Sequence, residues 1–503
     1  MEEELLQKHT TTEHGAWLAL EESRSSRHWL PWHPDVAEGE ADDDCEDPER
    51  LVLFDDIKDF VRPFSEPRQQ LQILMTYLGL LGVEIDCDLP SNSQAYFKRV
   101  KTHLNSVGQV AKNSSYVGAC ESSPLSQSLQ IKVINNVFEQ SVGKFQGHER
   151  SELTYLWLIW KLQEFQMVTK DMGKKDRKGK AKELKQFAKK ILGEDVNRSD
   201  LRVWEGYALL EWAIGNTEEG DKVMSGALSM TSFDLTAGHL TLDSCQASRL
   251  YRLYAEHMFG TLDKSDQKRN KLLLLLVIFA ANDNFKMSKD SSPVSSVQLL
   301  KAKRNFQMGL DCLLSGETLI AEPAWEIGKR GCLLEHWSNC YAMFEYLTSG
   351  LKSADSVFDQ VLSRLETSSD VVPDEPSLPK FMTNACIGYD PKMTFLANLK
   401  ERLTIASVKL AQHQVSSTVS PLRTLRDPMM LALSKLPDSL PLLLVFLKTE
   451  SSANILGQLR RRLLPIAKQA NTPLPWITAV LGELQRQHCL DQQLLAELPQ
   501  TGN

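Results

Sequence analysis

Apolar side chains recur every three to four residues along most of this 503-residue chain, whereas strict apolar–polar alternation is hard to find. A period near 3.6 is typical of amphipathic α-helices, and a period of two would indicate strands. The clearest helical segments are 153–168, 180–192, 201–213, 218–230, 246–259, 297–314, 330–347, 354–365, 393–414 and 455–464. Short polar breaks such as Gly215-Asn216 and Ser349-Gly350 separate them. Because short links make successive helices turn back on each other, the pattern predicts an all-α fold of antiparallel helix pairs.

Three helices share one spacing, in which a tryptophan is followed three residues later by a second side chain and seven residues later by a glutamate. The sets are Trp157, Trp160 and Glu164; Trp204, Tyr207 and Glu211; and Trp476, Ala479 and Glu483. Offsets of three and seven share one helix face. The aromatic residues would fill the space between neighbouring helices, and the glutamate would hydrogen-bond a partner. At Trp337 the same offsets give Cys340 and Phe344.

A second amphipathic helix follows each of these three, at 180–192, 217–230 and 489–498. Such a helix pair cannot bury its apolar face alone, so neighbouring pairs must stack. The sequence therefore predicts an α-solenoid. The alternative is an irregular helical domain in which the tryptophans share a spacing by coincidence.

Composition excludes several classes of protein. The 57 basic and 65 acidic side chains leave a net charge of −8, so the chain as a whole is no polycation, and any nucleic-acid contact needs a local patch. The amino terminus is acidic and has no apolar core, which excludes a secretory signal. The longest apolar run, Leu272 to Ala281, is half the length of about 20 residues that a membrane span needs. We expect a soluble protein of the reducing cell interior.

No motif indicates an enzyme, a metal site or a cofactor. Phosphate-binding glycine loops, His-Glu-x-x-His and Gly-x-Ser-x-Gly are all missing, and the nine cysteines form no Cys-x-x-Cys pair. Cys312, Cys332 and Cys340 lie in apolar helical surroundings, which predicts buried core positions. The sequence thus predicts a non-catalytic protein without a cofactor.

The most distinctive stretch is residues 23–57, where Trp29, Pro31, Trp32 and Pro34 crowd into six positions. Two prolines so close together cannot lie inside a helix. Two interpretations remain open for this element: a structural clasp over neighbouring helices, or a partner-binding surface with aromatic anchors. Its candidate residues are Arg27, His28, Trp29, Pro31, Trp32, Asp47, Pro48, Arg50, Phe54, Asp55 and Asp56.

A basic segment at residues 170–190 holds ten Lys or Arg and three acids, with Lys174, Lys175, Arg177 and Lys178 at its densest part. It is interpreted as a solvated face of a repeat helix, as a contact for RNA phosphates or as a nuclear import signal. Composition also suggests a domain plan. Residues 1–82 hold the Trp/Pro element, the acidic loop and flanking helices, 83–127 form a long polar loop or insertion, 128–365 a helical repeat array, 366–380 a linker, and 381–503 carboxyl-terminal helical repeats.

Part of the sequence resembles a known family. Ser23-Arg24, His28-Trp29-Leu30-Pro31-Trp32-His33-Pro34, Asp44-Cys45-Glu46-Asp47-Pro48-Glu49-Arg50 and Val52-Leu53-Phe54-Asp55-Asp56-Ile57 are similar to the signature block of the nuclear RNAi-defective-2 (necessary-for-RNA-interference) family. The helix from Trp204 to Glu211 resembles the first helix of the half-a-tetratricopeptide repeat. Thinner similarity extends through residues 344–350 and 475–476.

The resemblance implies a nuclear, non-catalytic scaffold in RNA interference, co-transcriptional gene silencing and exosome-linked RNA surveillance. Its partners would be nuclear RNA-processing proteins, including a Ski2-like exosome helicase. The family binds that helicase through a disordered arm upstream of the signature block. Because this chain begins just before the block, we expect the arm to be absent and assign helicase binding to no residue. The alternative is a generic cytoplasmic peptide-binding adaptor of the tetratricopeptide type.

Overall fold

The computed structural model of the chain describes Trp17 and residues 51–59, 63–83, 127–169, 172–231, 242–262, 266–281, 293–314, 324–369, 391–415, 421–439, 442–443, 445–447, 456–470, 472 and 474–480. The chain forms two compact units, Met1–Gln72 and Ile73–Asn503. The first unit contains the short helix α3 (Phe54–Ile57), and the division between the units falls within α4 (Pro67–Leu80).

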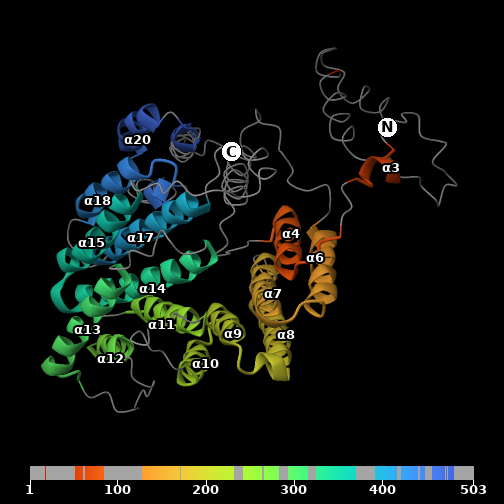
Figure 1. The fold of residues 1–503 in the computed structure, drawn as a ribbon, viewed down its shortest axis with the longest axis horizontal. Coiled ribbons are helices and arrows are strands. Elements are labelled where there is room, and N and C mark those ends of the chain that lie inside the picture. Colours follow the sequence, from red (N-terminus) through yellow and green to blue (C-terminus); the bar gives the residue numbers. More distant parts are fainter. Residues whose placement is uncertain are drawn as a thin grey trace, which may run out of the picture. The chain divides into compact units, whose positions relative to one another are not determined.

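The second unit is helical throughout its described residues, which contain no strand (Figure 1). In chain order its remaining helices are α6 (Gln127–Val142), α7 (Gly147–Val168), α8 (Lys174–Gly193), the 3-10 helix η3 (Asp195–Asn197), α9 (Leu201–Ala213), α10 (Thr217–Ser229), α11 (Leu242–Gly260), α12 (Asp266–Ala281), α13 (Ser296–Leu314), α14 (Ala324–Ser349), α15 (Leu351–Ser369), α17 (Pro391–Val415), α18 (Pro421–Lys435) and α20 (Leu456–Ala470). The prediction of an all-α fold is confirmed.

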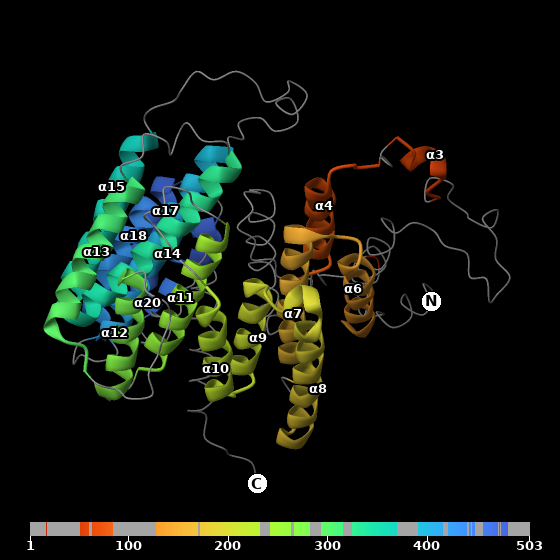
Figure 2. The same cartoon turned by 60° about the horizontal axis from the view of Figure 1, so that its bottom comes forward.

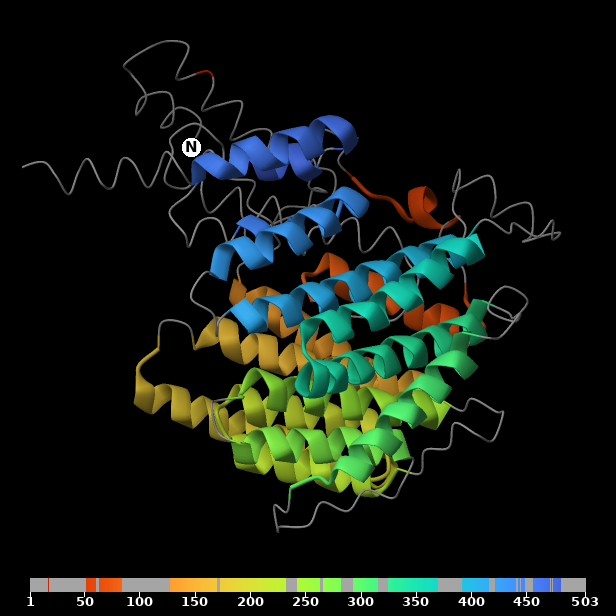
Figure 3. The same cartoon turned by 90° about the vertical axis from the view of Figure 1, so that its left-hand side faces the viewer.

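Two sets of helices alternate along the second unit. The first set, α7, α9, α11, α14 and α17, forms a continuous row in which each helix packs against the next. The helices α8, α10, α15 and α18 each pack against the first-set helix that precedes them in the chain (Figures 1 and 2). Between α11 and α14 the chain forms α12 and α13, which pack against each other; α12 contacts both α11 and α14, and α13 contacts α14. In Figure 3 the helices from α12 to α18 lie in successive, roughly parallel rows. This neighbour-to-neighbour packing is that of an α-solenoid, as the sequence predicts.

Two of the tight turns use glycine in a left-handed conformation. Gly215 follows α9 with φ +93°. Its amide donates to the carbonyl oxygen of Trp212, and the amide of Asn216 donates to that of Glu211 at 2.9 Å. Gly350, also at φ +93°, joins α14 to α15 in the same way, and its amide donates to the carbonyl of Glu345. These bonds satisfy the last carbonyls of each helix, and only glycine adopts this φ without steric cost. Both breaks predicted from the sequence are confirmed.

The hydrophobic core runs along the array and is most aromatic where α12, α13 and α14 meet. The Trp337 ring lies between Phe279 and Phe306, at ring-centroid distances of 4.9 and 5.3 Å, and its Nε1 donates to the carbonyl oxygen of Phe306 at 3.0 Å. Gly309 lies against the same indole, and a Cβ at that position would overlap the ring. The absence of a side chain at Gly309 therefore lets α13 approach the bulky Trp337. The apolar run Leu272 to Ala281 forms most of α12 and is buried in this core.

Candidate functional site

Most of the Trp/Pro signature element lies outside the described residues, including Arg27, His28, Trp29, Pro31, Trp32, Asp47, Pro48 and Arg50. The structure describes its last part, where Asp56 closes the first turn of α3 by accepting a hydrogen bond from the Leu53 amide at 2.9 Å. Lys58 Nζ lies 2.9 Å from Asp55 Oδ1. Phe54 projects into solvent with 71% of its surface exposed.

The exposed apolar residues around α3 form a surface that we call the α3 surface: Val52, Leu53, Phe54 and Ile57. Four apolar side chains exposed within six residues is unusual for a short helix that builds no core of its own, because burial of each would contribute about 1.5–3 kcal/mol. The acids Asp55 and Asp56, which sequence analysis placed in the same candidate site, hold the turn that presents them.

The repeat glutamates occupy equivalent, largely buried positions on the first-set helices. In α9, Glu211 is fully buried and lies 2.9 Å from Lys185 Nζ of α8, and Asn216 Nδ2 donates to it at 2.8 Å. In α7, the less buried Glu164 accepts from Asn135 of α6 at 3.3 Å and from Lys161 at 2.8 Å. The glutamate thus has a polar partner on the preceding helix, so it connects one helix pair to the next.

A third copy of this arrangement is present in α14, one residue away from the position that sequence spacing indicated. Tyr341 and Glu345 are four residues apart, as are Tyr207 and Glu211, and Lys303 Nζ of α13 lies 2.9 Å from Glu345. The tryptophan offsets do not locate this copy, because at Trp337 they give Cys340 and Phe344. Ser338 stands in place of the first tryptophan, and the aromatic–Glu spacing alone would have found this copy.

The tryptophans at the first signature position differ in burial. Trp157 is 9% exposed and lies between the rings of Phe138 and Phe187, with centroid distances of 6.1 and 4.9 Å. Trp204 is half-buried and donates from Nε1 to the carbonyl oxygen of Arg198 at 2.8 Å. Trp476 is 38% exposed, contrary to the expectation that it packs between helices. Its partner Glu483 lies outside the described residues, as does the predicted helix 489–498.

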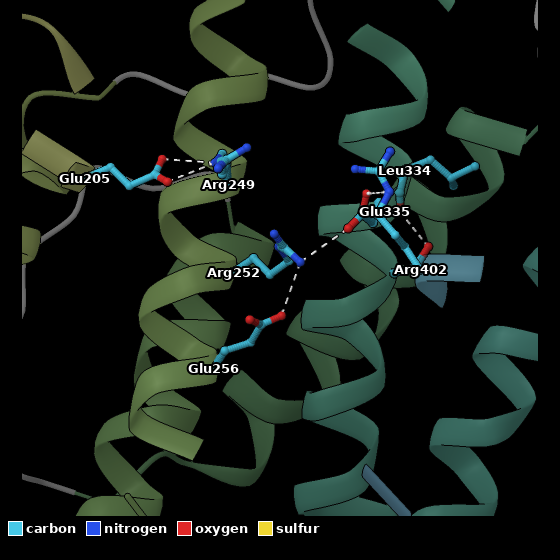
Figure 4. A network of polar contacts seen from close by, with 8 residues as sticks. Glu205, Arg249, Arg252, Glu256, Leu334, Glu335 and Arg402 are labelled. Carbon is cyan, nitrogen blue, oxygen red and sulfur yellow. Dashed lines mark hydrogen bonds and ion pairs between the residues drawn. The ribbon is translucent and has the colours of Figure 1, made fainter. Parts of the chain in front are cut away.

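A second set of buried polar groups connects the five helices of the first set, and sequence analysis missed it. Arg249 of α11 donates from Nε to both carboxylate oxygens of Glu205 in α9, at 3.0 and 3.1 Å, and from NH2 to Tyr155 OH in α7 at 3.2 Å. One turn further along α11, Arg252 NH1 lies 3.3 Å from both Glu256 and Glu335 of α14. Figure 4 shows Glu205 facing Arg249, and Arg252 facing both Glu256 and Glu335.

Glu335 extends the set to α17, where Arg402 Nε lies 3.3 Å from its second oxygen (Figure 4). The complete set, which we call the charge ladder, is Tyr155, Glu205, Arg249, Arg252, Glu335 and Arg402. Glu205 and Glu335 are almost wholly buried, so removing their hydration costs free energy that the guanidinium partners must offset. Burial, followed by the charge of Glu205, raises the pKa of Tyr155, so this phenol stays protonated.

The charge ladder joins neighbouring helices of the first set. Both of its carboxylates, Glu205 and Glu335, are almost wholly buried and lie against arginine side chains of other helices. Elsewhere, His257 stacks on Trp212 with ring centroids 3.8 Å apart, and burial lowers its pKa. In the described part of the chain, no three His, Cys, Asp or Glu side chains are placed to hold a metal ion. No described helix is both long and apolar enough to cross a membrane.

The prediction that these cysteines occupy buried core positions is confirmed for Cys340 and is wrong for Cys312. Cys340 is buried, and burial raises the pKa of its thiol. Cys312 is exposed, because it lies on the outer face of α13, opposite the buried Phe306, Leu310 and Leu313. The side chain of Cys332 is outside the described set.

The basic segment forms the amino-terminal part of α8, and every residue from 172 to 180 is exposed. Lys174, Lys175 and Lys178 extend from the helix without an ion pair to any described residue, while the Arg177 guanidinium lies 5.9 Å from the centroid of the Phe165 ring. Phe187 faces inward, against Trp157. The basic side chains are thus presented on a regular helix whose only aromatic residue is turned into the core.

Comparison with known proteins agrees with the resemblance of the signature block. The model of the family described as "NRDE-2, necessary for RNA interference" matches residues 2–86. The chain is also 28% identical over 518 aligned positions to a mouse protein named "Nuclear exosome regulator NRDE2", a match that includes 97% of this chain. The amino-terminal part of the chain is thus similar to the NRDE-2 family model, and nearly the whole chain is similar to a protein of that name.

The human protein of the same name is 26% identical over 514 aligned positions, again with 97% of this chain. Both relatives are longer, and this chain spans 42% of the length of each. Their names describe nuclear proteins, in agreement with the nucleus predicted from the signature block. No solved structure matches the chain.

The pairing of Lys185 with Glu211 predicts a pH-dependent change in stability. Burial alone would raise the pKa of Glu211, but hydrogen bonds from Lys185, Asn216 and Tyr207 lower it below its ordinary value. A lowered folded-state pKa contributes stability above the unfolded pKa of about 4.3 and loses it as pH falls through the folded pKa. Lys185→Met should therefore cost about 2–3 kcal/mol at pH 7, because it leaves a buried carboxylate without its cation.

That loss should shrink toward pH 4, where the unpaired carboxyl of the variant becomes protonated. Urea unfolding at the two pH values measures it. Lys222→Met is the matched control, because Lys222 lies 2.7 Å from Glu219 in an exposed pair, and solvent screens such a pair so that its loss should have little effect. If Lys185→Met proved as stable as this control at pH 7, the contact between Lys185 and Glu211 would not stabilise the packing of the helix pairs.

Proposed function

We propose that this chain is a non-catalytic nuclear scaffold in RNA processing linked to exosome-dependent RNA surveillance, and that it takes part in RNA interference and co-transcriptional gene silencing. The observation that carries this proposal is the similarity of 97% of the chain to two proteins named nuclear exosome regulators. The generic cytoplasmic adaptor gains no comparable support.

The architecture supports a scaffold rather than an enzyme. Its buried ionisable groups, in the charge ladder and at the repeat glutamates, pair with one another across helix contacts and so serve the array itself. An array of helix pairs presents long outer surfaces on which partners can be positioned. We propose nuclear RNA-processing proteins as those partners, and a Ski2-like exosome helicase, which the family resemblance implies, is the first to test.

We propose the α3 surface as one protein-docking element. Leu53 and Phe54 are exposed by more than half, and exposed aromatic and aliphatic anchors commonly supply most of the binding free energy of an interface. Asp55, Asp56 and Asp59 lie beside these side chains, so the fitting partner is a protein segment with apolar residues flanked by Lys or Arg.

The experiment is affinity recovery of the tagged 503-residue chain from nuclei after nuclease treatment. We expect nuclear RNA-processing proteins with the wild-type chain, and recovery about tenfold lower with Leu53→Ser/Phe54→Ser, because losing two apolar anchors removes roughly 1.4 kcal/mol or more of binding. Val297→Ser/Met308→Ser removes two equally exposed apolar side chains from α13 and serves as the control. Recovery of no RNA-processing protein, or a cytoplasmic location of the fluorescent chain, would contradict the proposed function.

A further inference from the structure

The amino-terminal half of α8 carries a charge pattern that weakens the helix it belongs to. Between Lys174 and Lys190 there are nine basic residues and two acids. Lys174, Lys178 and Lys182 succeed one another at intervals of four, so they are neighbours on one helix face, where like charges repel by roughly 0.2–0.5 kcal/mol per pair. Lys174, Lys175 and Arg177 also occupy the first turn, where the helix dipole favours acids over bases.

The fold neutralises only part of this charge. Lys180 lies 2.7 Å from Glu183, and Lys185 lies 2.9 Å from Glu211. The other lysines of the helix, at positions 174, 175, 178, 182, 189 and 190, are exposed and make no ion pair with a described residue. In a chain of net charge −8, such a concentration is a local exception. A solvated repeat helix needs no such arrangement, because mixed charges would stabilise it better.

We propose that the exposed face of α8 binds the phosphate backbone of RNA. The basic stretch from Lys174 to Lys190 rises about 24 Å along the helix. A basic face of this length can contact several phosphates of one nucleic-acid strand. Bound phosphates would neutralise the lysines and so remove the repulsion between them. RNA binding would thus account for a charge pattern that is unfavourable in the isolated helix. The proposed function enters this inference only in the choice of RNA as the polyanion.

The position of Phe187 specifies the mode of binding. This is the only aromatic residue of α8, and it packs against Trp157 instead of facing the solvent. Single-strand binders stack successive bases on exposed aromatic rings. Since α8 offers no such ring, binding should be independent of sequence, should depend steeply on salt, and should favour duplex RNA, whose phosphates are more closely spaced, over a single strand.

The test uses the purified 503-residue chain with a mixed-sequence RNA duplex of about 20 base pairs and an oligouridine strand of about 20 nucleotides, titrated between 50 and 200 mM salt. In the variant Lys174→Gln/Lys175→Gln/Lys178→Gln/Lys182→Gln, the lysines that pair with Glu183 and Glu211 are kept, as is Arg177 over Phe165. We expect duplex affinity to fall about tenfold or more at 50 mM salt. The slope of log affinity against log salt should decrease by about 0.9 for each lost phosphate contact, or about 3–4 in total.

The matched control, Lys301→Gln/Arg304→Gln/Lys352→Gln/Lys409→Gln, removes the same charge from exposed positions on α13, α15 and α17 and should change affinity less than about twofold. The α8 variant should also unfold at the same temperature as the wild type or higher, because the repulsion is removed.

Three results would overturn the proposal: no retention of the wild-type chain on duplex RNA at 50 mM salt, an equal loss in the control variant, or a loss of nuclear entry by the α8 variant with unchanged RNA affinity. The last would identify an import signal. None of these results bears on protein recovery after nuclease treatment, so the proposed function is tested separately.

Discussion

Glu335→Leu should destabilise the second unit by about 3 kcal/mol. Glu335 lies almost fully buried on α14, with one carboxylate oxygen 3.3 Å from Arg252 of α11 and the other 3.3 Å from Arg402 of α17. Removing one partner of a buried ion pair typically costs about 3–5 kcal/mol, because the remaining charge is desolvated and uncompensated. Arg252 and Arg402 keep some solvent contact, which places the expected loss at the lower end. Urea unfolding followed by circular dichroism measures it.

Glu256→Leu provides the control for this prediction. Glu256 contacts the same Arg252 at the same 3.3 Å, but its side chain is 38% exposed, so its loss should cost about 0.5 kcal/mol. A triple variant, Arg252→Met/Glu335→Leu/Arg402→Met, should recover most of the stability, because apolar side chains of similar volume replace a buried ion triad at little net cost. If Glu335→Leu and Glu256→Leu proved equally mild, the charge ladder would not be a source of stability.

A structural role for the charge ladder follows from where its members lie. Each arginine meets a carboxylate on a different helix, so correct pairing requires every first-set helix to be in one register relative to its neighbour. Apolar contacts alone tolerate small shifts along a helix. We therefore infer that the charge ladder selects the register of the array.

The helical array was predictable from the sequence because it depends on local patterns. Apolar periodicity located α7, α9, α11 and α14, and the glycines at 215 and 350 marked their turns. Periodicity was less useful for α4 and α6, where Gln, Ser and Asn dilute the apolar pattern. The domain plan placed helices in both regions, but no individual range was predicted for either helix.

The charge ladder was not predictable, because its contacts join residues far apart in the chain. Arg249 and Glu205 are 44 positions apart, and Arg252 and Glu335 are 83 apart. Helical periodicity reports which face of a helix is buried and gives no information about what lies opposite. A weak signal did exist: Glu205 and Glu335 are acids on helices whose other faces are mostly apolar. The same limitation explains why Cys312, on an apolar helix, was assigned to the core.

Trp157→Ala should be the most destabilising change among the signature tryptophans, at about 3–5 kcal/mol. The Trp157 indole is 9% exposed and contacts Phe138 of α6 and Phe187 of α8 as well as its own helix. Its removal would leave a cavity where three helices meet, and both aromatic contacts would be lost with it. Loss of stability should appear in urea unfolding as a lower midpoint with little change in slope.

Trp476→Ala is the matched comparison, since sequence spacing gave the two tryptophans the same role while the structure gives them different burial. Trp476 has 38% of its surface exposed. Its truncation should therefore lower the free energy of unfolding by about 1 kcal/mol or less, because less apolar area returns to water and no closed cavity forms. A large and equal loss in both variants would mean that the spacing defines a common packing position after all. A large difference would mean that the two sequence-equivalent positions are packed differently, and that the aromatic–Glu spacing of Tyr207–Glu211 and Tyr341–Glu345 is the better guide to the repeat.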